Sequence, residues 1–278
     1  MLTHVGLFEG SGIPSYIAEC CGMKAVAWCE SDLCCQYCLA KLFPGAIGFS
    51  DVRTADWSNI PQPVTLLTAG VPCQPVSVAG KQKGREDERW LWPDTIRAIE
   101  SIRPSWIVLE NPPAIRLHGL ERIAADLEGI GYDLIPKGRD GRFTPLCVGA
   151  WAVGAPHKRD RVWIVGHTRR QFESSVQLAD ADQAGRKERL RVGNHDATEL
   201  TPVIRSRWPS RPGEPQHDWE APRLIECGVG DATNELARRL RSRTNKALLR
   251  MAGNGWVPQI ASIIYTWIVE VENARPNL

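Results

Sequence analysis

Residues 70–77, with the sequence GVPCQPVS, place a cysteine between a proline and a glutamine. They follow the apolar run 64–69, so Cys73 is expected on a loop that leaves a buried strand, with its direction fixed by the neighbouring prolines. A free thiol has a pKa of about 8.5, and a nucleophilic role therefore requires a polar, electropositive surrounding. Glu110 and Asn111 follow the next apolar run, 106–109. The sequence thus predicts a cysteine nucleophile with a carboxyl group within reach.

Other residues capable of chemistry also follow short apolar runs in the first 135 residues. These are Gly10 and Gly12 after residues 5–8, Glu30 after residues 25–29 and Asp51 after residues 46–49. Apolar runs that alternate with helical stretches indicate a parallel sheet with crossover helices. Ligands bind at the carboxyl ends of the strands in such a sheet. We therefore expect the active site at that edge.

Gly10 and Gly12 predict a tight turn that allows a nucleotide-like ligand to approach the backbone closely. The third glycine of the dinucleotide fingerprint is missing, which argues against a nicotinamide cofactor. Glu30, about twenty residues further on, stands where a carboxylate accepts hydrogen bonds from ribose hydroxyls. Taken alone, these features fit a plain turn and a solvated helix cap equally well.

The rest of the chain divides into two parts. Residues 161–165 predict a further strand, and residues 258–271 predict an apolar helix that packs back on the first part. Residues 167–250 show no clear periodicity and are interrupted by prolines. We expect an α/β fold, with a Rossmann-like, mostly parallel sheet flanked by helices built from residues 1–166 and 251–278. Residues 167–250 are expected to form a small, irregular domain.

Charge is distributed unevenly along the chain. Residues 137–250 carry 22 Lys or Arg and 14 Asp or Glu, a net charge of +8, whereas the remainder has a net charge of −6. The basic part is suited to a polyanion such as nucleic acid. The same distribution also fits ordinary surface charge.

Export, membrane insertion and metal binding are not expected. No run approaches the roughly 18 apolar residues of a membrane span, and the first residues lack a signal pattern. The nine cysteines are expected to stay reduced in a soluble, cytoplasmic protein. Cys35 and Cys38 form a Cys-x-x-Cys pair, but no second pair follows at zinc spacing, so we expect no metal site.

These residues give the chain a resemblance to the cytosine-5 DNA methyltransferases, in their bacterial or phage form, over most of its length. The matching blocks, in the family's order, are residues 8–12 (FEGSG), 72–74 (PCQ), 110–112 (ENP), 159–161 (RDR) and 253–258 (GNGWVP). The second and third blocks together are highly specific. The resemblance implies transfer of a methyl group from S-adenosylmethionine to carbon 5 of a cytosine in double-stranded DNA.

The resemblance also implies roles for individual residues. Cys73 would be the nucleophile, Glu110 would contact the base edge, and Arg159 and Arg161 would lie near the flipped cytosine and its backbone. The residues that would hold S-adenosylmethionine are Phe8, Gly10, Gly12, Glu30, Asp51, Pro72 and Asn254. Asn111 would brace the cysteine loop, and residues 167–250 would form the target-recognition domain. The residues expected to contact DNA are Gln74, Ser77, Arg238 and Arg239, although the last two also fit a solvated helix face.

The chain departs from the family pattern at five positions, none of which removes a reacting group. Gly6 stands where the family often has Asp, Val71 where Phe is usual, Pro112 in place of Val, His157 in place of Gln, and Trp256 in place of a smaller residue.

Three other functions share part of this pattern. An RNA cytosine-5 methyltransferase shares this fold, but the Cys-Phe-Thr tripeptide of its tRNA-acting members is absent. A catalytically silent DNA-binding relative would not need Cys73, Glu110 and Arg161. A nicotinamide oxidoreductase would have no use for the 72–74 loop. We expect the protein to be a monomer in a bacterial cell or a phage-infected host. The resemblance is also compatible with a cognate restriction endonuclease as a partner.

Overall fold

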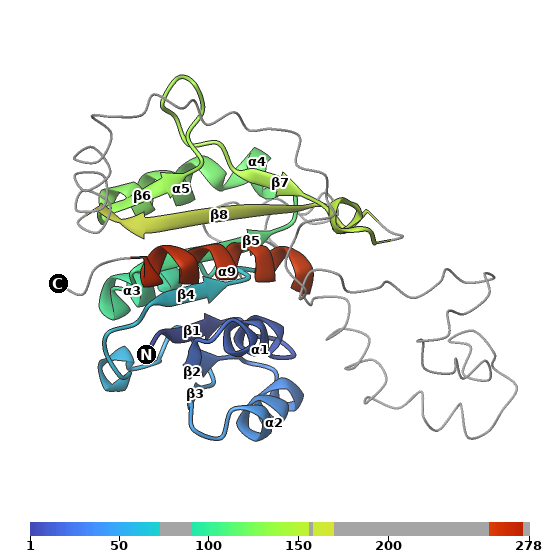
Figure 1. The fold of residues 1–278 in the computed structure, drawn as a ribbon. Helices are drawn as coiled ribbons and strands as arrows, with labels where there is room; N and C mark the ends of the chain where they lie inside the picture. The colour runs from blue at the N-terminus through green and yellow to red at the C-terminus, as the bar shows by residue number, and fades with distance from the viewer. Residues whose placement is uncertain (73–89, 156–157, 170–255, 275–278) are drawn as a thin grey trace, which may run out of the picture.

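The computed structural model describes residues 1–72, 90–155, 158–169 and 256–274. Eight strands of these residues form one sheet in the order β3-β2-β1-β4-β5-β8-β6, with β7 paired to β8 (Figure 1). The strands are β1 Thr3–Leu7, β2 Lys24–Cys29, β3 Ile47–Phe49, β4 Leu66–Ala69, β5 Trp106–Asn111, β6 Tyr132–Ile135, β7 Leu146–Val148 and β8 Arg161–Thr168.

Helices cover both faces of this sheet. The helices are α1 Ile13–Cys20, α2 Leu33–Leu42, α3 Trp92–Ile102, α4 Ile115–His118, α5 Leu120–Gly129 and α9 Pro258–Asn273, with short 3-10 turns η1 Trp57–Asn59 and η4 Ala150–Val153. Successive strand side chains point to opposite faces. Leu66 therefore packs under α1 and α9, while the next residue, Leu67, packs under α3 and α5. The expected α/β architecture with a mostly parallel sheet is confirmed.

The strands from β1 to β5 are parallel, whereas β8 runs antiparallel to β5, β6 and β7. The sequence predicts β8, but no element was predicted between residues 112 and 160, where α4, α5, β6 and β7 lie. In α5 only Ile123 and Leu127 are buried. This sparse apolar pattern explains why the helix is less conspicuous in the sequence than α9.

Helix α9 packs against α1, as expected from its apolar face. Its buried residues Ile260, Ile264, Tyr265 and Ile268 join Leu66 and Trp106 in one core. The indole N–H of Trp106 donates a hydrogen bond to the Glu272 carboxylate at 2.6 Å. The last described helix is therefore tied to the centre of the sheet. No helix among the described residues is both long and apolar enough to cross a membrane.

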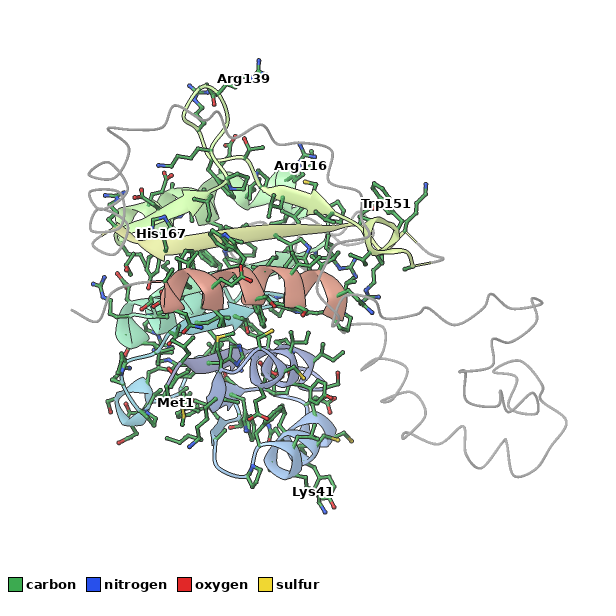
Figure 2. All side chains as sticks on the ribbon, viewed as in Figure 1. Met1, Lys41, Arg116, Arg139, Trp151 and His167 are labelled. Atoms are coloured by element: carbon green, nitrogen blue, oxygen red, sulfur yellow. The ribbon has the colours of Figure 1, made fainter. Side chains whose placement is uncertain are left out.

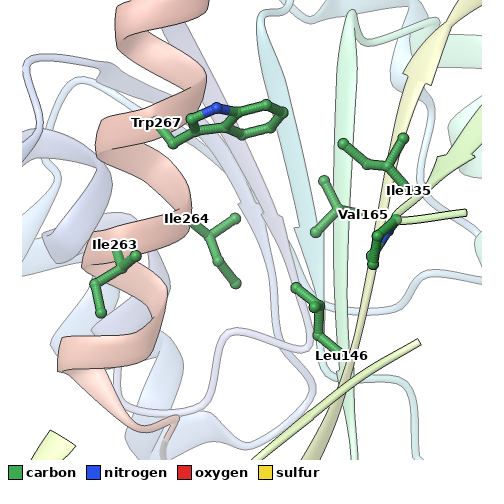
Figure 3. A pocket seen from close by; sticks show the side chains of 7 residues that line it. Ile135, Leu146, Val165, Ile263, Ile264 and Trp267 are labelled. Carbon is green, nitrogen blue, oxygen red and sulfur yellow. The ribbon is translucent and has the colours of Figure 1, made fainter. Parts of the chain in front are cut away.

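A groove of about 270 Å³ lies between α9 and the antiparallel strands. Ile263, Ile264 and Trp267 face Ile135, Leu146 and Val165 across it, and Pro136 completes its lining (Figure 3). None of these side chains offers the polar groups that fix a nucleotide-like ligand. The groove contains no predicted site residue.

Replacement of Ile268 by Ala tests the contribution of α9 to stability. The side chain is fully buried, so the truncation should lower the free energy of unfolding by about 2–5 kcal/mol. Urea denaturation followed by circular dichroism measures this loss. Glu270→Ala, at an exposed position of the same helix, should change stability by less than about 0.5 kcal/mol. Equal losses in the two variants would contradict the packing role of α9.

Candidate active site

The turn after β1 begins the candidate site. Phe8, Gly10 and Gly12 have positive φ angles of 56°, 57° and 85°, so the chain reverses sharply before α1 starts. A Cβ on Gly12 would lie 2.9 Å from the Leu39 side chain, which explains the glycine there. A Cβ on Gly10 would meet no described atom within 4 Å. The predicted glycine turn is present, and Gly10 borders open space.

Glu30, directly after β2, connects this turn to the start of α2. Its Oε2 accepts a hydrogen bond from the Gly10 N–H at 2.7 Å, and its Oε1 accepts one from the Asp32 N–H at 2.8 Å. A carboxylate oxygen can accept two hydrogen bonds. Each Glu30 oxygen therefore retains acceptor capacity for a ribose hydroxyl while it fixes the position of Gly10.

Asp51, after β3, is engaged with Arg53. The Arg53 guanidinium lies 2.7 Å from the Asp51 carboxylate, and the Arg53 backbone N–H donates to the same carboxylate at 2.9 Å. Hydrogen bonds from Arg53 lower the pKa of Asp51. Any ligand contact of Asp51 must share this carboxylate with Arg53, a constraint that the sequence did not reveal.

Glu110 and Arg161 form the central polar pair of the site. Arg161 Nε lies 2.7 Å from Glu110 Oε1, and both side chains are largely buried. The pair forms because β8 runs antiparallel to β5, so that the start of β8 meets the end of β5. Burial raises the pKa of Glu110 to about 7, against the opposing effects of Arg161 and Arg159. A carboxyl group with such a pKa can both donate and accept a proton near neutral pH.

Arg159 lies close to this pair, with a positive φ of 39°. Burial and the neighbouring Arg161 lower the pKa of its guanidinium, while Glu110 raises it. The carboxylate of Asp160, between the two arginines, accepts a hydrogen bond from the Trp151 indole at 3.1 Å. A Cβ on Gly149 would lie 2.3 Å from that carboxylate. Trp151 and Gly149 therefore set the direction of Asp160, and neither residue is among those predicted from the sequence.

The loop that leads to Cys73 leaves β4 beside this pair. Leu109, the residue before Glu110, pairs with Ala69 at the end of β4. A Cβ on Gly70 would lie 3.9 Å from Glu110 Oε2 and 3.1 Å from the Trp256 indole nitrogen. Trp256 also packs edge-on against Trp163 of β8, with ring centroids 5.1 Å apart. Gly70 thus leaves room for the large residue at position 256 and lies next to Glu110.

Gly6, where the family often has Asp, has a structural explanation. A Cβ at this position would lie 1.5 Å from Glu9 Oε1. The Glu9 carboxyl group occupies the volume of a side chain at residue 6, so the strand requires glycine there. The sequence signal was a glycine in an apolar strand with a glutamate three residues later.

Several predicted site residues lie outside the described residues. They are Cys73, Gln74, Ser77, Arg238, Arg239 and Asn254, together with His157 and nearly all of the expected domain 167–250. Their roles and the two-domain division stay predictions. The structure brings Pro72, Glu110, Arg159 and Arg161 to one edge of the sheet, and Asn111 is buried at the end of β5. Within the described residues, no three His, Cys, Asp or Glu side chains cluster to hold a metal ion.

The described geometry fits S-adenosylmethionine as a ligand. Gly10 borders open space, Glu30 offers acceptor oxygens, and Glu9 Oε1 is a buried oxygen without a hydrogen-bond partner. The three groups lie around the ends of β1 and β2, on one side of the point where the strand order reverses between β1 and β4. Open α/β sheets bind nucleotide ligands at this point.

Comparison with known proteins gives a family. The family model described as C-5 cytosine-specific DNA methylase matches residues 2–211. The type II methyltransferase M.PspPI of Psychrobacter sp. is 33% identical over 58% of this chain and 38% of its own length. M.HpaII of Haemophilus parainfluenzae is 30% identical over 59% of this chain and 45% of its own length. A mutant of DNMT2 from Spodoptera frugiperda aligns with a TM-score of 0.47 and 16% identity, over 60% of this chain and 50% of that chain. The chain thus spans less than half of the length of these curated relatives.

Replacement of Arg161 by Met tests the electrostatics of the pair. Because Arg161 holds down the pKa of Glu110, its removal should raise this pKa above about 7. Carbon-13 NMR of glutamate side-chain carboxyls, with Glu110→Gln as the assignment variant, measures the pKa. Arg142→Met, in an exposed turn, should leave the Glu110 titration unchanged. A Glu110 pKa that stays at its wild-type value in Arg161→Met would contradict the proposed coupling.

Proposed function

The chain belongs to the family of C-5 cytosine-specific DNA methylases, and we propose that it is a DNA (cytosine-5-)-methyltransferase. In this proposal a methyl group passes from S-adenosylmethionine to carbon 5 of a cytosine in double-stranded DNA. The observation that carries the proposal is the buried Glu110–Arg161 pair beside Gly70-Val71-Pro72, the segment that precedes Cys73. This pair supplies an acid and a positive charge next to the segment that leads to the candidate nucleophile.

The chemistry requires both a nucleophile and an acid. Carbon 5 of cytosine reacts too weakly with an electrophilic methyl group on its own. In the proposed reaction the Cys73 thiolate adds to carbon 6, which makes carbon 5 nucleophilic. Protonated Glu110 donates a hydrogen bond to ring nitrogen 3 and stabilises the negative charge that develops there. Methyl transfer would leave S-adenosylhomocysteine as the product. The proton on carbon 5 then passes to water, the C5–H electron pair re-forms the double bond between carbons 5 and 6, and the bond between carbon 6 and sulfur breaks to release the Cys73 thiolate.

The pKa of about 7 for Glu110 suits this role, because about half of the molecules carry the proton near neutral pH. Arg161 orients the Glu110 carboxyl group, because its Nε–H donates a hydrogen bond to Oε1 at 2.7 Å. Arg159 adds a second positive charge near the same position. Positive charges of this kind would favour the thiolate form of a nearby Cys73, which is the form that reacts.

S-adenosylmethionine would supply the methyl group as an electrophile. Phe8, Gly10 and Gly12 shape the turn that would receive it, and Glu30 would accept hydrogen bonds from its ribose hydroxyls. Asp51, Pro72 and Asn254 complete the proposed set. The target cytosine is stacked inside duplex DNA, so it must swing out, at a cost of a few kcal/mol. Residues 167–250 are proposed to hold the DNA, with Gln74, Ser77, Arg238 and Arg239 among the contacts.

Replacement of Cys73 by Ser tests the nucleophile. The serine alkoxide is scarcely populated near neutral pH, so methylation should become undetectable. Transfer of tritiated methyl groups from S-adenosylmethionine to duplex DNA measures the loss. Binding of DNA and cofactor should largely survive. Cys147→Ser, at an exposed cysteine on β7, should retain wild-type activity.

DNA that contains 5-fluorocytosine provides a second measurement of the same step. Fluorine cannot leave carbon 5 as a cation, so wild-type protein should form a covalent complex with this DNA and Cys73→Ser should not. Near-normal turnover by Cys73→Ser would exclude the covalent mechanism. Methylation of a matched RNA in place of DNA would favour the RNA-directed alternative.

Replacement of Glu30 by Ala tests the cofactor site. The change removes a carboxylate that would bind two hydroxyls, so affinity for S-adenosylmethionine should fall by roughly 10-fold or more, at about 1.5–3 kcal/mol for each hydrogen bond to a charged group. Calorimetry should show nearly unchanged affinity for DNA. Glu19→Ala, at an exposed position on α1, is the control. Wild-type cofactor affinity in Glu30→Ala would limit this residue to holding the backbone of Gly10 and Asp32.

A further inference from the structure

The Glu9 side chain folds back over its own strand. Phe8 and Gly10, on either side of it, both have φ angles in the left-handed region. This reversal carries the Glu9 carboxyl group over Gly6, where an added Cβ would lie 1.5 Å from Oε1 and 2.3 Å from the carboxyl carbon. Gly6 itself pairs with Trp28 of β2 and Thr68 of β4. The carboxyl group therefore lies over the middle of the parallel sheet, beneath the glycine turn.

The Glu9 carboxyl group is buried and incompletely paired. Glu9 is 3% exposed. Ser15 is a hydrogen-bond partner of this group, through its side chain and through its backbone N–H, which donates to Oε2 at 3.4 Å, whereas Oε1 has no hydrogen-bond partner. Burying an ionised carboxylate without a partner costs free energy. Such a group therefore stays protonated until a positively charged group comes close to it. Burial accordingly raises the pKa of Glu9 to about 7.

Among the residues that the structure describes, the groups around Glu9 supply no positive charge. On β1, His4 is buried and its pKa is lowered by burial to about 3, so its ring is neutral. That ring is held between Thr68 of β4 at 2.9 Å and Ser15 of α1 at 3.3 Å. From α9, burial holds the pKa of Tyr265 well above its ordinary value, so its hydroxyl is neutral too. Glu30 is negative and raises the pKa of Glu9 further.

A cofactor that extends from Glu30 to the segment before Cys73 must pass over the Glu9 carboxyl group. In the proposed function the ribose is bound by Glu30 after β2, and the methyl group must reach the segment after β4 that leads to Cys73. The strand order places β1 between β2 and β4. The amino-acid portion of the cofactor must therefore lie around the end of β1, above Glu9. That portion carries an ammonium group, and an opposite charge within about 4–6 Å stabilises an ionised carboxylate without direct contact.

We propose that Glu9 provides the countercharge for the α-ammonium group of S-adenosylmethionine and loses its proton when the cofactor binds. This inference rests on the proposed function, because it takes S-adenosylmethionine as the ligand. It assigns Glu9 a part in cofactor binding beyond filling the space at Gly6. Two consequences follow: binding releases a proton near neutral pH, and affinity increases with pH as Glu9 ionises.

Calorimetry in buffers of different ionisation enthalpy measures the released proton. At pH 7 wild type should release roughly half a proton for each S-adenosylmethionine bound, since a group at its pKa is half protonated. Affinity should be roughly fivefold higher at pH 7 than at pH 6, a range in which an α-amino group with a pKa of about 7.7–8.0 keeps its proton. In Glu9→Gln, which keeps the shape of the side chain, the contribution of Glu9 to both effects should vanish. Subtracting this variant from wild type removes the contributions of histidines elsewhere in the chain.

Two matched ligands locate the charge. S-adenosylhomocysteine retains the ammonium group and should release the same proton fraction. Methylthioadenosine lacks the amino-acid portion and should release none through Glu9. Glu19→Gln, on the exposed side of α1, should behave as wild type. Proton uptake in place of release, or equal pH dependence in wild type and Glu9→Gln, would overturn the role of Glu9 while leaving the proposed function intact.

A direct measurement on the wild-type chain avoids dependence on the folding of any variant. In carbon-13 NMR, one glutamate carboxyl should titrate near pH 7 together with Glu110, and its pKa should fall by at least one unit when S-adenosylmethionine is added. A pKa that stays near 7 in the complex would overturn the inference. Failure of wild type to bind S-adenosylmethionine at any pH would overturn both this inference and the proposed function.

Discussion

The pairing of β5 with two neighbours of opposite direction determines the candidate site. On one side β5 runs parallel to β4, which brings the end of β5 next to the segment that leads to Cys73. On the other side it runs antiparallel to β8, which brings the beginning of β8 to the same end. Glu110 is therefore adjacent to Gly70 and to Arg161 at once. A parallel strand in place of β8 would begin at the opposite edge of the sheet and could not deliver Arg161 to Glu110.

Glycines at the site make room for large polar or aromatic side chains. Gly6 accommodates the Glu9 carboxyl group, Gly70 accommodates Trp256, and Gly149 accommodates the hydrogen-bonded pair Trp151 and Asp160. Two of these arrangements involve positions at which the chain departs from its family's pattern, Gly6 and Trp256. Each departure therefore belongs to a pair of neighbouring residues, in which a glycine leaves the space that a large side chain occupies. The residue type at one position is explained by the residue type at the other.

Much of the fold could be predicted because its signals are local. Each buried parallel strand is a short apolar run, and a polar residue marks its end. Strand direction and backbone geometry are harder to predict from the sequence. The pairing of β8 with β5 depends on strand direction, which the apolar run of residues 161–165 does not encode. The engagement of Asp51 by Arg53 and the reversal that carries Glu9 over Gly6 depend on backbone geometry, so the residue types alone did not indicate them.

The length of β8 sets a requirement for the chain that connects it to α9. Trp151, just ahead of β8, and His167, near its last residue, lie at opposite ends of the strand (Figure 2). Arg169 follows at the far end, where its backbone N–H donates to the Gly131 carbonyl. Trp256 resumes the described chain against Trp163, near the other end. From Trp163 to Thr168 the strand rises roughly 17 Å at about 3.4 Å per residue. A shortened linker that joined residue 169 to residue 256 would need at least about five extended residues to return along the sheet without pulling β8 or α9 out of register.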